Sequence, residues 1–241
     1  MPRSETVLVM VQVNPKAAAT EQAMEAELQG LSAFLEQARA EDPSLPPLDA
    51  LVVQHHSTVA NAAAADAPTL PLPGAPGDRG LVIQDSLLDR RFQISTQAFF
   101  QVNSGAASVL YSLAGDWALP RGEADAPSNS SRTVLLDVCC GTGTIGITLA
   151  GRVGRVIGID MVASAIDDAK SNAQLNGLTN CEFVCGKAED VLGNILTRVQ
   201  QQDKEQQQEP DLVAIVDPPR GGLHPLVLRA LLAVSGRGVI P

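Results

Sequence analysis

From residue 133 onward, short apolar runs alternate with longer stretches that have helical spacing. Alternation of this kind predicts parallel strands, because a helical crossover brings the next strand back in the same direction. The sequence therefore predicts an α/β fold with helices on both faces of a parallel sheet, and a fifth strand begins at Gly238. The expected strands are 133–138, 155–159, 181–185 and 211–216, and the expected helices lie near 144–151, 162–176, 189–200 and 224–235.

The first of these strands leads into a glycine-rich turn. The strand is rich in β-branched and aliphatic residues, which is typical of a strand buried on both faces. Gly141 and Gly143 allow turn conformations that a Cβ would oppose, and they leave room for a ligand against the main chain. The spacing with Gly146 also fits a dinucleotide-binding pattern, which alone is a weak signal. An ordinary strand–turn–helix corner is the alternative.

Acidic side chains at the strand ends narrow the choice of ligand. Asp137 would repel a pyrophosphate but suits a cationic or zwitterionic ligand, which favours S-adenosylmethionine over NAD. Asp160, about 20 residues beyond the turn, can accept hydrogen bonds from ribose hydroxyls, and a helix N-cap is its alternative role. Glu189 and Asp190 follow the third strand, where they would either contact adenine or start a helix.

A rigid acidic loop follows the fourth strand as Asp217-Pro218-Pro219-Arg220. It lies at the carboxyl edge of the expected sheet, where ligands of open α/β sheets bind. Two prolines fix the loop, so Asp217 would point rigidly at the site. Amino-directed DNA methylases carry an aromatic residue where this chain has Arg220, which disfavours methylation of adenine N6. The positive charge of Arg220 would instead lie near a phosphate or a base.

Together these segments resemble the RNA uracil-C5 methyltransferases, most closely the eukaryotic tRNA branch, from roughly residue 80 to the end. The resemblance is carried by Phe99-Phe100-Gln101-Val102-Asn103, the 136–144 segment, Asp160 and Asp217-Pro218-Pro219-Arg220-Gly221-Gly222-Leu223. It implies a Rossmann-like class I methyltransferase fold, S-adenosylmethionine as cofactor and RNA, foremost tRNA, as partner. The cofactor contacts that it implies are Gln101, Cys139, Gly141, Thr144, Asp160 and Asp217.

The same resemblance implies two catalytic groups that this sequence lacks. The family's nucleophilic cysteine follows the fifth strand in a Ser-Cys-Asn-Pro segment and its general-base glutamate lies further on, whereas this sequence ends at Pro241. A thiolate must add to C6 before uracil C5 can attack a methyl group. Cys139 and Cys140 belong to the cofactor loop, and Cys181 and Cys185 are expected to pack within the third strand. We therefore expect a truncated chain that does not methylate RNA by itself.

The region before the methyltransferase segment predicts a second, smaller domain. We expect a small α+β domain over residues 1–94 and the methyltransferase domain over 95–241. The expected elements of the small domain are a strand at 5–13, a helix at 20–40 capped by Thr20, and a strand at 48–54. The stretch 62–78, rich in Ala, Pro and Gly, predicts an irregular, disordered-like insertion.

Two further elements are expected between residues 81 and 117. Residues 81–94 favour a hairpin with its turn at 85–90, and residues 104–117 favour a helix. That helix places Ala106, Leu110, Leu113 and Trp117 on one face, and residues 120–132 form a polar linker.

Composition limits the classes of function. The 241 residues are 45% hydrophobic with a net charge of −10, so a packed core is possible but a basic nucleic-acid-binding surface is not evident. No apolar run approaches the ~20 residues of a membrane helix, and no secretion signal is visible. Four cysteines do not suggest a disulfide framework, which favours an intracellular location. His55 and His56 lack further metal ligands, so we expect no metal, and the sequence leaves the oligomeric state open.

Three alternatives to a tRNA uracil-C5 methyltransferase follow. The first is a ribosomal-RNA member of the same family, which nothing in the sequence separates from the tRNA enzymes. The second is a catalytically inactive protein that binds S-adenosylmethionine. The third is a NAD-dependent oxidoreductase, which Asp137 and Asp217-Pro218-Pro219 disfavour.

Overall fold

The chain forms two compact units in a computed structural model. The first comprises Met1–Asp85 and Gln93–Gln97, and the second comprises Ser86–Phe92 and Ala98–Pro241. The domain boundary that the sequence predicts between residues 94 and 95 stays a prediction. The structure describes residues 7–14, 20–45, 48–55, 69–72, 82–96, 98–119, 132–206 and 211–234.

The first unit is a small sheet with one long helix. β1 (Val7–Val13) pairs in parallel with β2 (Leu48–His55), and β3 (Thr69–Pro71) pairs antiparallel to β2. α1 (Glu21–Glu41) begins as predicted, with the Thr20 side chain accepting a hydrogen bond from the Ala23 N–H at 3.1 Å. The expectation of an irregular 62–78 insertion is wrong at β3, because its backbone completes the ladder of β2; the remainder, apart from Leu72, lies outside the described residues.

A hairpin follows, with a tighter turn than the sequence suggested. β4 (Val82–Leu87) and β5 (Arg90–Ser95) form a two-stranded sheet. Only Leu88 and Asp89 connect them, with φ of 49° and 61°. Two successive positive φ values suit the twist of a two-residue hairpin turn, so the strands run further than expected.

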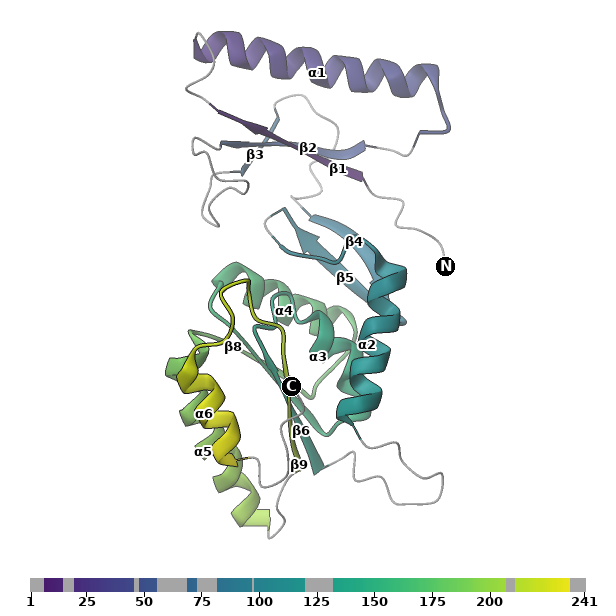
Figure 1. Ribbon diagram of the computed structural model, residues 1–241. Coiled ribbons are helices and arrows are strands. Elements are labelled where there is room, and N and C mark those ends of the chain that lie inside the picture. Colours follow the sequence, from purple (N-terminus) through teal and green to yellow (C-terminus); the bar gives the residue numbers. More distant parts are fainter. Residues whose placement is uncertain are drawn as a thin grey trace. The chain divides into compact units, whose positions relative to one another are not determined.

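The second unit holds a parallel sheet in the order β8-β7-β6-β9, as the alternation of strands and helices predicted (Figure 1). Its strands are β6 (Thr133–Val138), β7 (Arg155–Asp160), β8 (Cys181–Cys185) and β9 (Asp211–Val216). Every residue of β6 is buried, because strands flank it on both sides and helices cover both faces. The predicted strand at Gly238 and linker residues 120–131 lie outside the described residues.

Helices cover the sheet on both faces (Figure 1). α3 (Thr144–Leu149) and α4 (Ala163–Leu175) lie on one face, and α5 (Ala188–Gln206) and α6 (Pro225–Val234) lie on the other. The core beneath α5 and α6 contains alternate residues of β6 and β7 with side chains such as Leu192 and Leu231. The sequence predicted that this helix ends near residue 200, but α5 continues through Gln206, because Gln, Lys and Glu are good helix formers.

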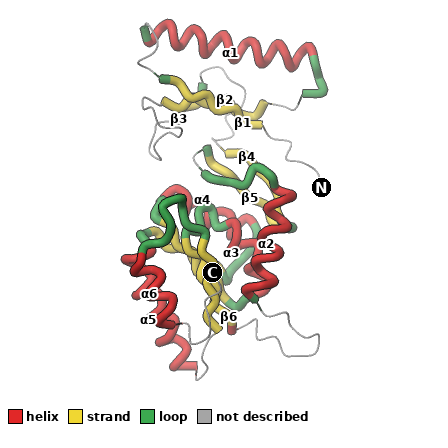
Figure 2. Tube along the Cα trace, in the orientation of Figure 1, coloured by secondary structure: helices red, strands yellow, loops and turns green. Residues whose placement is uncertain are grey.

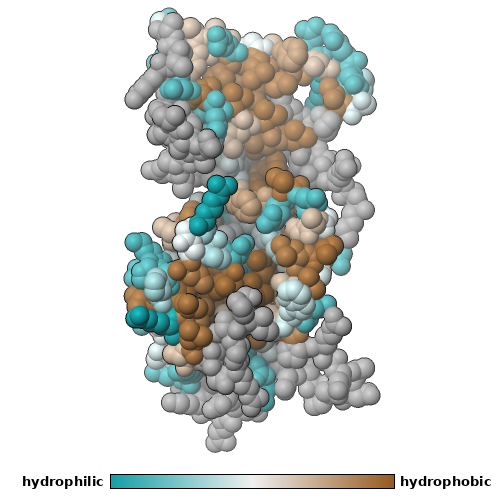
Figure 3. Space-filling model, in the orientation of Figure 1, coloured by the Kyte–Doolittle hydropathy of each residue, from teal (hydrophilic) through white to brown (hydrophobic). Residues whose placement is uncertain are grey.

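α2 (Ser104–Ala118) packs on the side opposite to its most apolar residues. Ala106, Leu110, Leu113 and Trp117 all face outward, and Trp117 is 69% exposed. The buried residues are instead Ala107, Tyr111 and Gly115. Small side chains on either side of one tyrosine let the helix approach its neighbours closely. Exposed hydrophobic side chains are visible on the surface of this unit in Figure 3.

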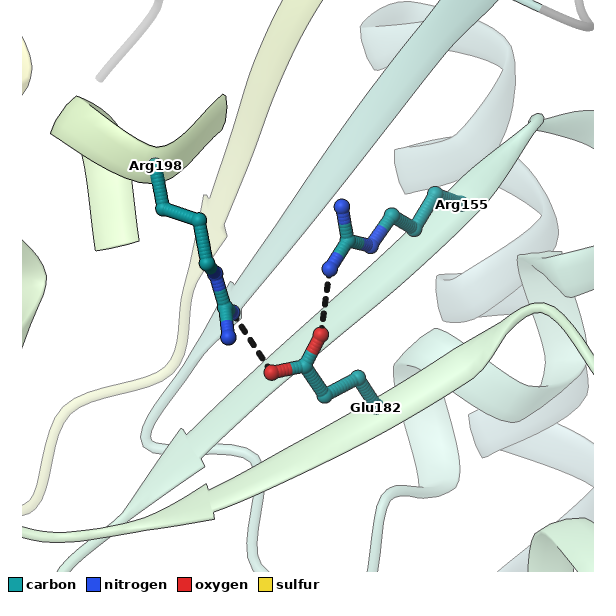
Figure 4. Close-up of polar contacts among 3 residues, drawn as sticks. All are labelled: Arg155, Glu182 and Arg198. Atoms are coloured by element: carbon teal, nitrogen blue, oxygen red, sulfur yellow. Dashed lines mark hydrogen bonds and ion pairs between the residues drawn. The ribbon is translucent and has the colours of Figure 1, made fainter. Parts of the chain in front are cut away.

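A charged cluster ties β7, β8 and α5 together. Glu182 of β8 accepts hydrogen bonds from Arg155 of β7 and from Arg198 of α5 (Figure 4). Burial raises the pKa of Glu182, but the hydrogen bonds and charges of the two guanidinium groups outweigh it and hold the pKa below its ordinary value. The carboxylate is therefore ionised and doubly paired.

Candidate functional site

The turn after β6 is bound to the neighbouring strand through its backbone. Cys139 has a φ of +66°, which is uncommon for a residue with a Cβ. The N–H groups of Cys139 and Cys140 both donate to the Ile159 carbonyl, at 2.8 and 3.0 Å. The backbone therefore leaves the sheet abruptly, and the following residues form a loop across its carboxyl end.

The two turn glycines have different roles. Both have positive φ, +53° at Gly141 and +77° at Gly143. A Cβ at Gly143 would lie 2.9 Å from ring carbons of Phe183, so this glycine is needed for packing. A Cβ at Gly141 would meet no atom within 4 Å, so the backbone there borders open space. Gly141 is therefore the position where a ligand can approach the main chain.

Asp137 is fully buried directly below the loop. Its Oδ2 accepts a hydrogen bond from the Gly146 N–H at 2.8 Å, while its Oδ1 has no partner among the described residues. Burial raises the pKa of Asp137 to about 7; the Gly146 hydrogen bond opposes this, and the charges of Asp217 and Asp160 add to it. An unpaired buried carboxyl oxygen of this kind is suited to a cationic or hydrogen-bond-donating ligand.

Asp160 joins the glycine loop to the start of α4. Its Oδ2 accepts a hydrogen bond from the Gly141 N–H and its Oδ1 accepts one from the Val162 N–H, each at 2.9 Å. The N-cap residue of α4 is Val162 itself, which makes no side-chain cap. Because each carboxylate oxygen can accept a further hydrogen bond, these contacts leave capacity for ribose hydroxyls. Ribose binding by Asp160 stays a prediction.

Asp217 follows β9 at the same end of the sheet. Its N–H donates to the Val138 carbonyl at 3.2 Å, so its backbone continues the ladder beside the glycine turn. The side chain is exposed, and a tight turn follows in which the Gly222 N–H donates to the Pro219 carbonyl at 2.8 Å. The loops after the parallel strands gather at this end (Figure 2).

Gln101 belongs to a separate segment and still lies near these strand ends. Burial raises the pKa of the Tyr111 hydroxyl, Gln101 opposes this, and the charges of Asp217 and Asp137 add to it, which puts all four residues in one neighbourhood. The structure thus brings Gln101 close to the residues predicted from the glycine turn. Its contact with a cofactor stays a prediction.

Thr144 and the cysteines complete the predicted set. The Thr144 hydroxyl lies 3.0 Å from the Thr142 hydroxyl and is buried in the loop. Burial raises the pKa of both Cys139 and Cys140, and the nearby aspartates add to this, so neither is an activated thiolate. The expectation that Cys185 packs within its strand is wrong, because it lies at the strand end, where its side chain is exposed.

Sequence reasoning missed three residues that support the site. Asn172, fully buried in α4, donates to the Thr142 carbonyl at 3.3 Å. Phe183 of β8 fills the space left by Gly143 and Gly158. Tyr111 lies on the buried face of α2, and its pKa is raised by burial and by the charges of Asp217 and Asp137. In each case the sequence offered one signal, which was a polar or aromatic residue at a position expected to face the protein interior.

Other groups considered in the sequence have structural positions. Glu189 and Asp190 lie in the first turn of α5, which suits the helix dipole and leaves contact with adenine a prediction. The described part of the chain contains no cluster of His, Cys, Asp or Glu arranged to hold a metal ion. Within those same residues, no helix has both the length and the apolar character to cross a membrane.

Comparisons with known proteins show what this chain is similar to. A methyltransferase domain model matches residues 129–208. The chain is 39% identical to zinc finger CCCH domain-containing protein 24 of Arabidopsis thaliana, over 95% of this chain and 36% of that protein. It is 48% identical to human tRNA (uracil-5-)-methyltransferase homolog A, over 67% of this chain and 23% of that protein. The chain thus spans well under half the length of these relatives.

A solved structure has a similar fold. It is the tRNA (uracil-54, C5)-methyltransferase of Pyrococcus abyssi in complex with S-adenosyl-L-homocysteine, with a TM-score of 0.52 and 26% identity over 79% of this chain and 40% of that chain. The parallel sheet is the Rossmann-like sheet of class I methyltransferases, as the sequence predicted. Over about two thirds of its length, the chain is thus similar to proteins named as tRNA (uracil-5-)-methyltransferases, and its residues 129–208 match a methyltransferase domain.

Proposed function

We propose that this chain provides the S-adenosylmethionine site of an enzyme that forms 5-methyluridine in tRNA. The observation that carries the proposal is the acidic end of the sheet. Asp137, Asp160 and Asp217 surround an open glycine turn, and among the described residues none of them forms an ion pair. Relatives named as tRNA (uracil-5-)-methyltransferases support the choice of substrate.

The residues present fit this cofactor. The unpaired Oδ1 of Asp137 and the exposed carboxylate of Asp217 favour a ligand with positive charge, such as a sulfonium or an ammonium group. Asp160 retains acceptor capacity for a ribose diol, and the backbone at Gly141 is open to contact. When bound, S-adenosylmethionine supplies an electrophilic methyl group. A pyrophosphate would be repelled by the same carboxylates, which disfavours NAD.

The described cysteines do not activate uracil. Carbon C5 of uracil is unreactive until a thiolate adds to C6, and a raised pKa keeps Cys139 and Cys140 protonated near neutral pH. The resemblance to the family supports a nucleophile in a Ser-Cys-Asn-Pro segment instead. The target base must leave its stack to reach such a site.

Transfer of labelled methyl from S-adenosylmethionine to unmodified tRNA tests the proposal. The 241-residue chain is compared with a version extended through a Ser-Cys-Asn-Pro cysteine, and the digested RNA is analysed for 5-methyluridine. We expect 5-methyluridine from the extended version alone. Methylation of another base, of ribosomal RNA only, or turnover by the short chain that Cys139→Ala abolishes would contradict it.

We also infer an intracellular location, which four cysteines without a disulfide pattern support. Microscopy of the protein fused to a fluorescent tag checks this inference. A secreted product would overturn it.

A further inference from the structure

The backbone of the glycine turn is fixed by hydrogen bonds on both sides of Thr142. Gly141 and Gly143 both have positive φ, and glycine changes backbone conformation at little steric cost. The peptide that joins Thr142 to Gly143 is nevertheless bonded at both ends. Its N–H, which belongs to Gly143, donates to the Cys140 carbonyl at 2.9 Å. Its carbonyl, which belongs to Thr142, accepts a hydrogen bond from Nδ2 of Asn172 at 3.3 Å.

Asn172 reaches the turn from the buried face of α4. Its side chain is fully buried, and burying an amide costs free energy unless the amide is hydrogen-bonded. One helical turn earlier, Ala169 Cβ would lie 3.1 Å from a Cβ at Gly143. The same face of α4 therefore packs on Gly143 and bonds the Thr142 carbonyl. Asparagine is also a weak helix former, so local helix propensity does not account for its presence in the middle of this face.

α4 is itself held at both of its ends. At the far end, Nδ2 of Asn176 donates to the main-chain carbonyls of Asn172 at 2.8 Å and Arg91 at 2.7 Å. The Arg91 N–H donates back to Oδ1 of Asn176 at 3.0 Å. At the near end, Asp160 accepts a hydrogen bond from the Val162 N–H. These contacts prevent α4 from shifting, so the amide of Asn172 has a fixed position below the turn.

We propose that Asn172 is a positioning residue that holds the 141–143 turn in the conformation that receives the cofactor. Without its hydrogen bond, the Thr142 carbonyl loses its partner, and two flanking glycines allow the turn to populate other conformations. The apparent affinity of a ligand falls in proportion to the fraction of molecules in the binding conformation. The role rests on the proposed function, because Asn172 acts on the cofactor only through the turn.

The first test measures binding of S-adenosylhomocysteine by calorimetry to the 241-residue chain. Asn172→Leu keeps the branched shape of the side chain and removes the donor, and we expect roughly 3- to 10-fold weaker binding, the effect of one hydrogen bond. Asn180→Leu is the matched control, because Nδ2 of Asn180 donates to the carbonyls of Ala150 and Val153 at 3.0 and 3.1 Å, before the amino end of β7. Both variants should unfold at lower urea concentration, and only Asn172→Leu should bind more weakly.

An equal loss of affinity in both variants would show a merely structural role and overturn the proposal. If Asn172→Leu does not fold, Asn172→Ser replaces it, because a serine side chain is too short to reach the Thr142 carbonyl. If the folded wild-type chain binds no S-adenosylhomocysteine, the proposed function fails and this role with it. Normal wild-type binding that the Asn172 variant leaves unchanged defeats this inference alone.

The second test needs no ligand and follows amide hydrogen exchange by NMR. Asn172→Leu should speed exchange at the Gly143 N–H by roughly 3- to 10-fold, since the peptide that contains it loses its other hydrogen bond. The Gly154 N–H, which lies beside the carbonyl that Asn180 bonds, should keep its rate. Asn180→Leu should have the reverse effect on the two amides. Equal acceleration of both amides in Asn172→Leu would show general destabilisation and overturn the proposal.

Discussion

Acidic side chains of one sheet have opposite environments at the glycine turn and at the Arg155–Glu182–Arg198 cluster. Glu182 has an arginine on each carboxylate oxygen, and its pKa is lowered. Asp137 has one backbone hydrogen bond, an unpaired oxygen and two further aspartates nearby, and its pKa is raised to about 7. The first arrangement is complete within the protein. The surroundings of Asp137 raise the free energy of its ionised form, and a cationic ligand would offset this penalty.

The largest expected effect is on the pH dependence of stability through Asp137. Because the folded pKa is raised from 3.8 to about 7, the folded state binds the extra proton, and stability should fall as pH rises between about 4 and 7. Each pKa unit corresponds to about 1.4 kcal/mol, so the loss should reach a few kcal/mol. Asp137→Asn should abolish this fall. Urea denaturation of both proteins across this pH range checks it, and parallel pH profiles would contradict it.

A second change tests ligand binding rather than folding. Asp160→Ala should weaken S-adenosylhomocysteine binding by about 1–3 kcal/mol, the range for stranding polar partners. Asp167→Ala is the control, because Asp167 is exposed on α4 and carries the same charge. Calorimetric titration of both variants gives the comparison. Equal affinities would remove Asp160 from the cofactor site.

The smallest effect is expected at the paired carboxylate. Glu182→Gln should cost about 1 kcal/mol of stability at neutral pH, since the pairs are about one-third exposed and partly screened. The folded pKa is below the ordinary 4.5, so the stabilisation is present above that value and lost as pH falls further. Urea denaturation at pH 7 and pH 3 measures both points. A change in S-adenosylhomocysteine affinity would contradict the separation of the two regions.

The sequence predicted the sheet well because its signals are local. Apolar runs, helical spacing and turn glycines gave β6 to β9 and α3 to α6 within a few residues. The face of α2 was not predictable from hydrophobicity, because its orientation depends on how closely Ala107 and Gly115 let it approach other elements. β3 was missed because a three-residue strand is defined by its pairing with β2 rather than by its own composition.

The candidate site was predictable in its residues but not in its geometry. Asp137, Gly141, Asp160 and Asp217 stand out because they lie near the carboxyl ends of predicted strands. The unpaired Oδ1 of Asp137 depends on three-dimensional contacts that no spacing reveals. Tyr111 was missed for the same reason, since its burial depends on which face of α2 packs against the rest of the unit.

The central claim is that the acidic end of the sheet is built for S-adenosylmethionine rather than a dinucleotide. Calorimetric titration of the 241-residue chain with S-adenosylhomocysteine and, separately, with NAD tests it most directly. We expect binding of S-adenosylhomocysteine and much weaker or no binding of NAD, because the exposed carboxylate of Asp217 and the fraction of Asp137 that is ionised at neutral pH repel a pyrophosphate. Binding of NAD with no response to S-adenosylhomocysteine would contradict the claim.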